Sequence, residues 1–136
     1  MNLKVFTDGG ARGNPGPAAC AYLIYDPVNL REKSGKYLGV TTNNVAEYQG
    51  VIEGLKSIRE NIKEEVQKIE FFLDSQLVVM QLNGLWKIKD QNLKRLVTEI
   101  KELENDLNIF YNYIPREKNK DADLLVNLTL DNHGSA

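Results

Sequence analysis

KVFTDGGARGNPGPAA, residues 4–19, is the stretch from which the rest of the fold can be worked out. Beta-branched and aromatic residues before Asp8 favour an extended strand, whereas the glycines and prolines after it favour a turn. The stretch therefore predicts a strand over residues 3–8 that ends on Asp8. Aspartate is unfavourable in a core strand, so packing gives little reason for it. Its simplest uses are to cap the turn, to bind a metal ion, or both.

Length and composition bound the class of protein. The 136 residues are 42% hydrophobic, which predicts one folded domain over 1–136 with a flexible tail at 131–136. The single Cys20 lies in an apolar run, so we expect a buried thiol and a reducing compartment. Met1 leads directly into the first strand, and no run approaches the roughly 18 apolar residues of a membrane span. We therefore expect a cytoplasmic protein without a membrane partner.

The first half of the chain alternates in the way that strands do and then changes to a helical period. Strands are predicted at 3–8, about 18–25 and about 33–40, joined by short turns as an antiparallel meander. Apolar residues then recur at helical spacing from 43 to about 62. The candidate caps of this helix are Thr41, Thr42 and Asn43.

The second half predicts two more strands separated by helices. KIEFFLD at 68–74 reads as a buried strand, and it also ends on an aspartate, Asp74. Ser75 is placed to cap a short helix that ends near Leu82. The remaining predicted elements are a helix with a leucine-rich stripe over 93–107, a strand over 108–114 and a terminal helix over about 120–130.

This order predicts an α/β fold whose five-stranded mixed sheet has three antiparallel strands plus two parallel ones, flanked by helices. Right-handed crossovers lay the strands at 3–8, 68–74 and 108–114 parallel. Ligands of such sheets gather beyond the carboxyl ends of parallel strands. If the first two of these strands are neighbours, about 4.8 Å apart, Asp8 and Asp74 can share a metal ion.

Two further acids, Glu47 and Asp123, lie near the starts of predicted helices. The helix dipole favours an acid there, so each can have that role alone. Gly50 and Gly54 leave the helix face of Glu47 nearly bare, which indicates close approach to the sheet or to a ligand. We therefore expect Glu47 to point inward.

Four converging acids would repel one another unless divalent cations neutralised them. Oxygen ligands without a histidine or cysteine cluster indicate magnesium or manganese rather than zinc. The only histidine, His133, is interpreted as a frayed residue of the tail, which argues against nucleophile–histidine catalysis.

At this point the chain resembles a known family, type 1 ribonuclease H in its compact archaeal-like and bacterial form. Four segments carry the resemblance, in family order, and each contains one of the four acids. They are FTDGGARGNPGPAA at 6–19, TTNNVAEYQGVIEGL at 41–55, LDSQLVV at 73–79 and REKNKDADLLVN at 116–127.

The resemblance implies a ribonuclease H-like fold and an endonuclease that hydrolyses the RNA strand of RNA–DNA hybrids by a two-metal mechanism. It implies two Mg²⁺ or Mn²⁺ ions as cofactors and RNA products with 5′-phosphate and 3′-hydroxyl ends. By family analogy Asp8 bridges both ions, Glu47 and Asp74 favour the leaving-group side, and Asp123 favours the side of the attacking water.

The resemblance also implies a substrate surface. Recognition of RNA requires contact with the 2′-hydroxyl, which is accessible in the minor groove of an A-like duplex. The residues that match family positions there are Asn14, Asn43, Asn44 and Gln76. Thr42 matches a position that helps to hold a DNA phosphate at a helix N-terminus. Their alternative roles are turn former for Asn14, helix cap for Asn43 and ordinary surface for Gln76.

Two departures from the best-known bacterial pattern affect the substrate side. GLWKIKDQNLKRL is shorter than that pattern's basic, tryptophan-rich insertion, although Trp86, Lys87 and Lys89 remain candidate contacts to the substrate backbone. The alternatives are a packed Trp86 and solvated lysines. The mobile-loop histidine is missing from PREKNKD at 115–121, where Glu117 is the nearest candidate for proton transfer or product release, or else a surface acid.

We expect the protein to be a monomer that cleaves hybrids. Three other functions stay open. Compact members of the family can also act on double-stranded RNA. A non-catalytic nucleic-acid binding module on the same fold is a second alternative, and the presence of all four acids argues against it. A structural or assembly domain would use the leucine-rich stripe at 93–107 as an interface, yet such a stripe usually belongs to the core.

Overall fold

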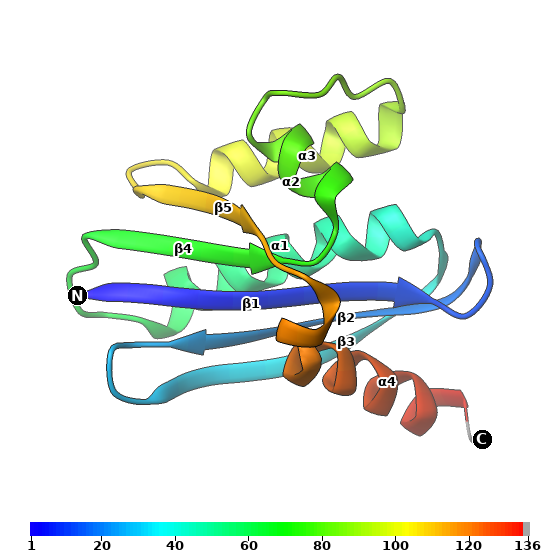
Figure 1. Cartoon of the computed structure of the whole chain (residues 1–136), viewed down its shortest axis with the longest axis horizontal. Helices are drawn as coiled ribbons and strands as arrows, with labels where there is room; N and C mark the ends of the chain where they lie inside the picture. The colour runs from blue at the N-terminus through cyan, green and yellow to red at the C-terminus, as the bar shows by residue number, and fades with distance from the viewer. Residues whose placement is uncertain (135–136) are drawn as a thin grey trace.

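The centre of the molecule is a five-stranded sheet in the order β3-β2-β1-β4-β5 (Figure 1). It is seen in a computed structural model that describes residues 1–134. Strands β1, β2 and β3 form the predicted antiparallel meander, while β4 runs parallel to β1 and β5 runs parallel to β4. The strands are β1 Asn2–Ala11, β2 Gly16–Tyr25, β3 Leu30–Thr41, β4 Lys68–Leu73 and β5 Ile109–Tyr113.

The sequence predicted that strand β1 ends on Asp8, but the strand continues to Ala11. Gly9 and Gly10 stay extended because β2 pairs with them in antiparallel register. The parallel pairing with β4 does stop earlier, at Phe6 opposite Phe72. Asp8 therefore lies just beyond the parallel ladder, at the edge of the sheet where the site was predicted.

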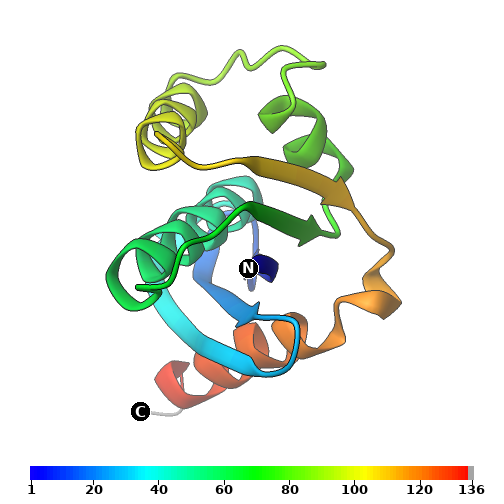
Figure 2. The same ribbon diagram turned by 90° about the vertical axis from the view of Figure 1, so that its left-hand side faces the viewer.

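Helices cover both faces of the sheet (Figure 2). α1 packs against β1 and β2 and against α3, while α4 packs against β2 and β3 from the opposite side. A short 3-10 turn, η1, joins β5 to α4. The bounds are α1 Asn43–Asn61, α2 Gln76–Leu82, α3 Gln91–Leu103, η1 Arg116–Lys118 and α4 Lys120–Gly134.

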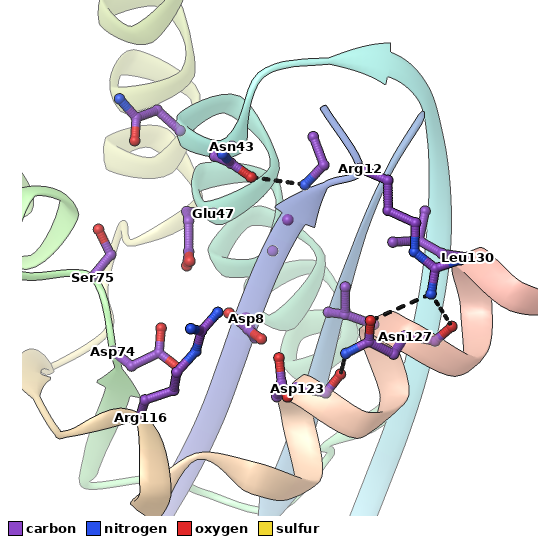
Figure 3. Close-up of a pocket in the computed structure, with 15 residues that line it drawn as sticks. Asp8, Arg12, Asn43, Glu47, Asp74, Ser75, Arg116, Asp123, Asn127 and Leu130 are labelled. Atoms are coloured by element: carbon purple, nitrogen blue, oxygen red, sulfur yellow. Dashed lines mark hydrogen bonds between the residues drawn. The ribbon is translucent and has the colours of Figure 1, made fainter. Parts of the chain in front are cut away.

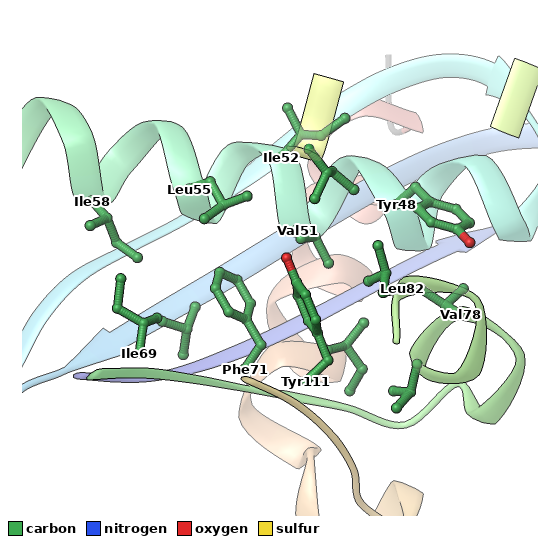
Figure 4. Packing of buried hydrophobic residues seen from close by; sticks show 14 of the residues in the cluster. Tyr48, Val51, Ile52, Leu55, Ile58, Ile69, Phe71, Val78, Leu82 and Tyr111 are labelled. Carbon is green, nitrogen blue, oxygen red and sulfur yellow. The ribbon is translucent and has the colours of Figure 1, made fainter. Parts of the chain in front are cut away.

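The main core lies between α1, α3 and the sheet (Figure 4). Ile52 and Leu55 of α1 and Phe71 of β4 are fully buried there. The predicted stripe of α3 contributes Leu96 and Ile100 to the same core. This stripe is therefore not an exposed interface, which removes the main argument for an assembly domain.

Several boundaries differ from the prediction. α3 ends at Leu103 rather than near Leu107, because the chain then turns through Asp106, whose φ is 65°. Helix α4 continues to Gly134 rather than ending near Leu130. His133 stacks on Tyr37 with ring centroids 3.6 Å apart, so its interpretation as a frayed residue was wrong. The rest of the predicted tail, residues 135–136, lies outside the described residues.

A smaller cluster seats α4 on β2 and buries Ala19, Ala21, Val126 and Leu130. Cys20 is buried as predicted. Among residues 1–134, the helices all lack the combination of length and apolar content that crossing a membrane requires.

Candidate active site

Three carboxylates from three different elements meet at one end of the sheet (Figure 3). Asp8 comes from β1, Asp74 follows β4, and Glu47 projects from the beginning of α1. Each offers one carboxylate oxygen, and these oxygens lie within 4.8 Å of one another. The predicted proximity of Asp8 and Asp74 is confirmed, and Glu47 points inward as expected.

The fourth acid, Asp123, stands at the side of this cluster. It lies in the first turn of α4 and lines the same pocket, which has a volume of about 510 Å³. Its charge contributes to raising the pKa of both Asp8 and Asp74. The structure therefore brings all four predicted acids to one pocket, and three of them have carboxylate oxygens within 4.8 Å of one another.

Glycines allow α1 to approach β1 closely enough for Glu47 to reach Asp8. A Cβ atom on Gly9 would lie 2.2 Å from the backbone carbonyl carbon of Ala46. A Cβ atom on Gly50 would lie 2.9 Å from the carbonyl oxygen of Asp8. The close approach predicted from the helix glycines is thus confirmed at Gly50, and Gly9 supplies the matching gap in the strand.

The carboxylates are costly to ionise in this arrangement. Burial raises the pKa of Asp8 to about 7, and the charge of Asp74 adds to the shift. Burial likewise raises the pKa of Glu47 well above its ordinary value, with Asp8 and Asp74 adding to it. The pKa of Asp74 is also raised by burial, although a hydrogen bond from Asn119 opposes the shift.

The pocket has the chemistry of a divalent-cation site. Glu47 is only 8% exposed, and its Oε2 is buried without a hydrogen-bond partner. A buried oxygen of this kind is unfavourable unless something neutralises or binds it. The surrounding ligands are carboxylate oxygens, which hard divalent cations prefer. The residues present therefore fit a bound metal ion.

Two residues of the site were missed by the sequence prediction. Asn119 is 1% exposed, and its Nδ2 donates hydrogen bonds to the carbonyl oxygen of Thr7, at 2.9 Å, and to Oδ2 of Asp74, at 3.3 Å. Arg116 lines the pocket, and its guanidinium extends toward Asp74 and Asp8 (Figure 3). Both lie in the charged segment 115–121, where no spacing or apolar neighbour distinguishes them from surface residues.

The predicted substrate residues of the β1–β2 loop and of the start of α1 form a linked group. Oδ1 of Asn14 accepts from the backbone N–H of Asn43 at 3.0 Å, and Oδ1 of Asn43 accepts from that of Ala11 at 2.8 Å. Thr42 is the helix cap, because its hydroxyl accepts from the N–H of Val45 at 3.2 Å. The loop is thereby fixed to the helix beside the acids.

These residues divide between two neighbouring hollows. Asn43 and Asn44 line the acidic pocket, and Asn44 also lines a smaller hollow of about 250 Å³. Asn14 and Thr42 line this smaller hollow. Gln76 is exposed at the first position of α2, next to the pocket residue Ser75.

The remaining candidates lie away from the acids. Trp86, Lys87 and Lys89 belong to the segment between α2 and α3, and all three are exposed. Trp86 is 43% exposed and is therefore not the packed core aromatic of the alternative interpretation. Glu117 lines a different pocket, which Asn119 also lines.

Known proteins share this fold and much of this sequence. Residues 6–129 match the model of the Reverse transcriptase-like family. Ribonuclease HI of Halobacterium salinarum is 36% identical over 131 residues, which are 95% of this chain and 64% of that protein. The crystal structure of RNase H1 from the same archaeon superposes with a TM-score of 0.90 at 34% identity, covering 97% of this chain and 99% of that one. The chain belongs to the type 1 ribonuclease H family.

Two other matches describe this type 1 ribonuclease H further. LC11-RNase H1, whose structure was determined in complex with an RNA/DNA hybrid, is 39% identical with a TM-score of 0.90, covering 96% of this chain and 98% of that one. The bifunctional protein Rv2228c of Mycobacterium tuberculosis is 37% identical over 134 residues, 96% of this chain. The chain spans only 36% of that longer relative. The predicted ribonuclease H-like fold is thus confirmed.

Proposed function

We propose that this chain is a divalent-metal-dependent endonuclease that hydrolyses the RNA strand of RNA–DNA hybrids, leaving 5′-phosphate and 3′-hydroxyl ends. The observation that carries the proposal is the carboxylate cluster, with its three oxygens within 4.8 Å and the unpartnered Oε2 of Glu47. A non-catalytic binding module has no need for three acids held together at such electrostatic cost. The family membership of the chain adds support.

In this proposal Asp8, Glu47, Asp74 and Asp123 hold two Mg²⁺ or Mn²⁺ ions. Bound ions of this kind lower the pKa of water and stabilise the leaving oxygen of a phosphodiester. The protein's own part is to hold the ligands in place. Asn119 fixes Asp74 through its hydrogen bond, and the close α1–β1 contact fixes Glu47 beside Asp8. Arg116 offers a guanidinium for a substrate phosphate at the mouth of the pocket.

Selection of RNA is assigned to the asparagines beside the acids. Asn43 and Asn44 line the pocket, and Asn14 is hydrogen bonded to the backbone of Asn43. An amide side chain both donates and accepts, so it can pair with a 2′-hydroxyl in the minor groove. Gln76 extends this surface on the α2 side, and Thr42 supplies a hydroxyl near the N-terminus of α1 for a DNA phosphate.

The decisive test compares matched RNA–DNA, RNA–RNA and DNA–DNA duplexes with Mg²⁺, with Mn²⁺ and with chelator. We expect the wild type to cut the RNA strand of the hybrid only when a metal is present. Asp8→Asn should abolish the cutting, whereas Asp121→Asn, which changes an exposed acid on the same helix as Asp123, should retain it.

Each other result has a defined meaning. Binding of the hybrid without cleavage under every metal condition would refute the enzyme and favour the binding module. Cleavage of RNA–RNA as well as the hybrid would extend the substrate range to double-stranded RNA. Cleavage by Asp8→Asn at the wild-type rate would refute the assigned metal site.

A further inference from the structure

A second pocket of about 500 Å³ lies on the same face of β1 as Asp8. Phe6 and Asp8 are two residues apart on a strand, so their side chains point to the same face. Together with residues of β1 and β2, residues of η1 and of the start of α4 line the second pocket. Asn119, at their junction, lines the second pocket and holds Asp74 of the acidic pocket. The proposed ribonuclease activity uses no other residue that lines this second pocket, apart from the candidate Glu117.

The sheet side of the second pocket is aromatic. Phe6 meets the ring of Tyr25 edge to face, with centroids 5.9 Å apart. Phe6 also stacks on Phe72 at 5.0 Å, which holds its ring in position. Both Phe6 and Tyr25 line the pocket, together with Leu23. Such a wall favours a flat ring system.

The pocket also carries more cations than acids, with Lys4 on the sheet beside Phe6 and with Lys118 and Lys120 on η1 and α4. Lys4, Lys118 and Lys120 line the pocket and are exposed, and in residues 1–134 none of the three forms an ion pair. Two acids, Glu117 and Asp121, balance them only in part. The first N–H groups of α4, which lack acceptors within the helix, add positive potential at the same rim. These lysines favour an anion in the pocket.

Asn119, which lines the pocket, has a side-chain polar atom without a partner. Both hydrogens of the Asn119 amide are directed to acceptors, the carbonyl oxygen of Thr7 and Oδ2 of Asp74. These bonds fix the orientation of the amide, so Oδ1 cannot exchange places with the nitrogen. Oδ1 is buried and has no hydrogen-bond partner. A ligand that donates a hydrogen bond would remove this cost.

We propose that the second pocket binds a nucleoside monophosphate. The base lies against Phe6 and Tyr25, the phosphate lies among Lys4, Lys118 and Lys120, and a hydroxyl or amino group donates to Oδ1 of Asn119. The volume is within the range of small-molecule sites, about 300–1,000 Å³. A free mononucleotide and the 5′-terminal nucleotide of an RNA share this chemistry. Because Asn119 also holds Asp74, occupancy of the second pocket is coupled to the acidic pocket.

The test is an NMR titration of the full chain with AMP in the presence of a chelator, which prevents metal-mediated binding of phosphate to the acids. We expect saturable shifts of the Asn119 side-chain amide and of the backbone amides of 118–122, with a Kd of about 1 mM or tighter. Adenosine and inorganic phosphate should each bind about tenfold more weakly, because each lacks one half of the ligand. A 5′-phosphorylated RNA trinucleotide, compared with its 5′-hydroxyl form, tests the terminal-nucleotide source.

Variants locate the binding. Lys4→Ala and Lys118→Ala should each weaken AMP binding about fivefold, whereas Lys68→Ala, which changes a half-buried lysine of β4 outside the pocket, should leave it unchanged. The proposal is overturned if AMP gives no saturation by about 10 mM. It is equally overturned if Lys4→Ala binds AMP like Lys68→Ala, or if adenosine binds as tightly as AMP. Metal-dependent cleavage of the hybrid by each variant, measured alongside, reports that its fold is retained.

Discussion

Asp8 is the residue at which folding and the proposed chemistry conflict most directly. It is 6% exposed, and its pKa is raised to about 7 by burial and by the charge of Asp74. An acid whose pKa is higher in the folded state favours folding only while it is protonated. Its contribution is fully present below the ordinary value of 3.8 and is lost as the pH rises through about 7.

The upward shift of the Asp8 pKa on folding predicts how the stability of the metal-free protein depends on pH. Asp8→Asn removes the charge, so in chelator it should raise the free energy of unfolding at about pH 8 by up to about 4 kcal/mol. The gain should shrink as the pH is lowered and should be lost below about 3, where the wild-type carboxyl is protonated in both states. Urea unfolding at a series of pH values measures the difference. Asp106→Asn, in an exposed turn, is the control, and an equal gain from it would contradict the electrostatic cause.

Asn119 is predicted to act as a positioning residue for Asp74. Asn119→Ala removes the hydrogen bond to Oδ2 of Asp74, so we expect the Mg²⁺ concentration for half-maximal hybrid cleavage to rise about tenfold. Asn112→Ala is the matched control, because the Asn112 amide donates only to a strand carbonyl, that of Phe71, at 3.2 Å.

The two asparagine variants separate positioning from a general loss of stability. If both shift the Mg²⁺ dependence equally, the effect belongs to the fold and not to Asp74. If Asn119→Ala leaves the Mg²⁺ dependence unchanged, the hydrogen bond has no part in holding the ligand. Thermal unfolding of both variants gives the stability on which this comparison depends.

The four acids were accessible from the sequence, whereas Asn119 and Arg116 were not. Asp8 and Asp74 stand out because each follows an apolar strand, and the helix glycines direct attention to Glu47. Asn119 is held in place by a hydrogen bond to the carbonyl oxygen of Thr7, which lies 112 positions earlier in the chain. Such a contact leaves no local periodicity, so only the folded structure reveals it.

At the scale of elements, the close contact of α1 with β1 positions the site. It depends on Gly9, where a Cβ atom would lie 2.2 Å from backbone atoms of Ala46. Gly9→Ala should therefore lower the free energy of unfolding by about 3 kcal/mol, because backbone atoms cannot move aside without shifting α1. Gly10→Ala is a stringent control, since its Cβ atom would meet nothing nearer than 4.0 Å.

Urea unfolding of the two glycine variants measures this prediction. Gly10→Ala should stay within about 0.5 kcal/mol of the wild type. Equal stability of Gly9→Ala and the wild type would mean that α1 can move away from β1 without cost. Gly9→Ala should also reduce hybrid cleavage, because a shifted α1 carries Glu47 away from Asp8.

Element types were predictable because each has a clear period, whereas several ends depended on partners. The sequence placed the end of β1 at Asp8 because glycines normally interrupt strands, but pairing of Gly9 and Gly10 with β2 keeps them extended. The end of α4 was set too early because the stacking of His133 on Tyr37 joins residues that are far apart in the chain. Tertiary contacts of this kind override local propensity.

At the scale of the whole molecule, a net charge of −2 conceals a separation of charges. Four of the 19 acids line the pocket, while lysines and Trp86 are exposed on the segment between α2 and α3. Binding of a polyanion depends on this local distribution and not on the total charge. The segment is therefore the natural place for contacts to the phosphate backbone of the proposed hybrid substrate.

A double variant tests whether this segment contributes to substrate binding and not to the chemical step. Lys87→Ala with Lys89→Ala should raise the KM for the hybrid about threefold, with kcat unchanged. Binding should also lose about two phosphate contacts, so the binding constant should fall less steeply as the salt concentration rises. Lys33→Ala with Lys63→Ala removes the same charge from exposed positions near the start of β3 and beyond the end of α1. A loss of kcat in the first variant, or an equal rise of KM in the second, would contradict the assignment. Because phosphate contacts act on binding and the acids on the chemical step, the KM and kcat effects should separate cleanly between this segment and the acidic pocket.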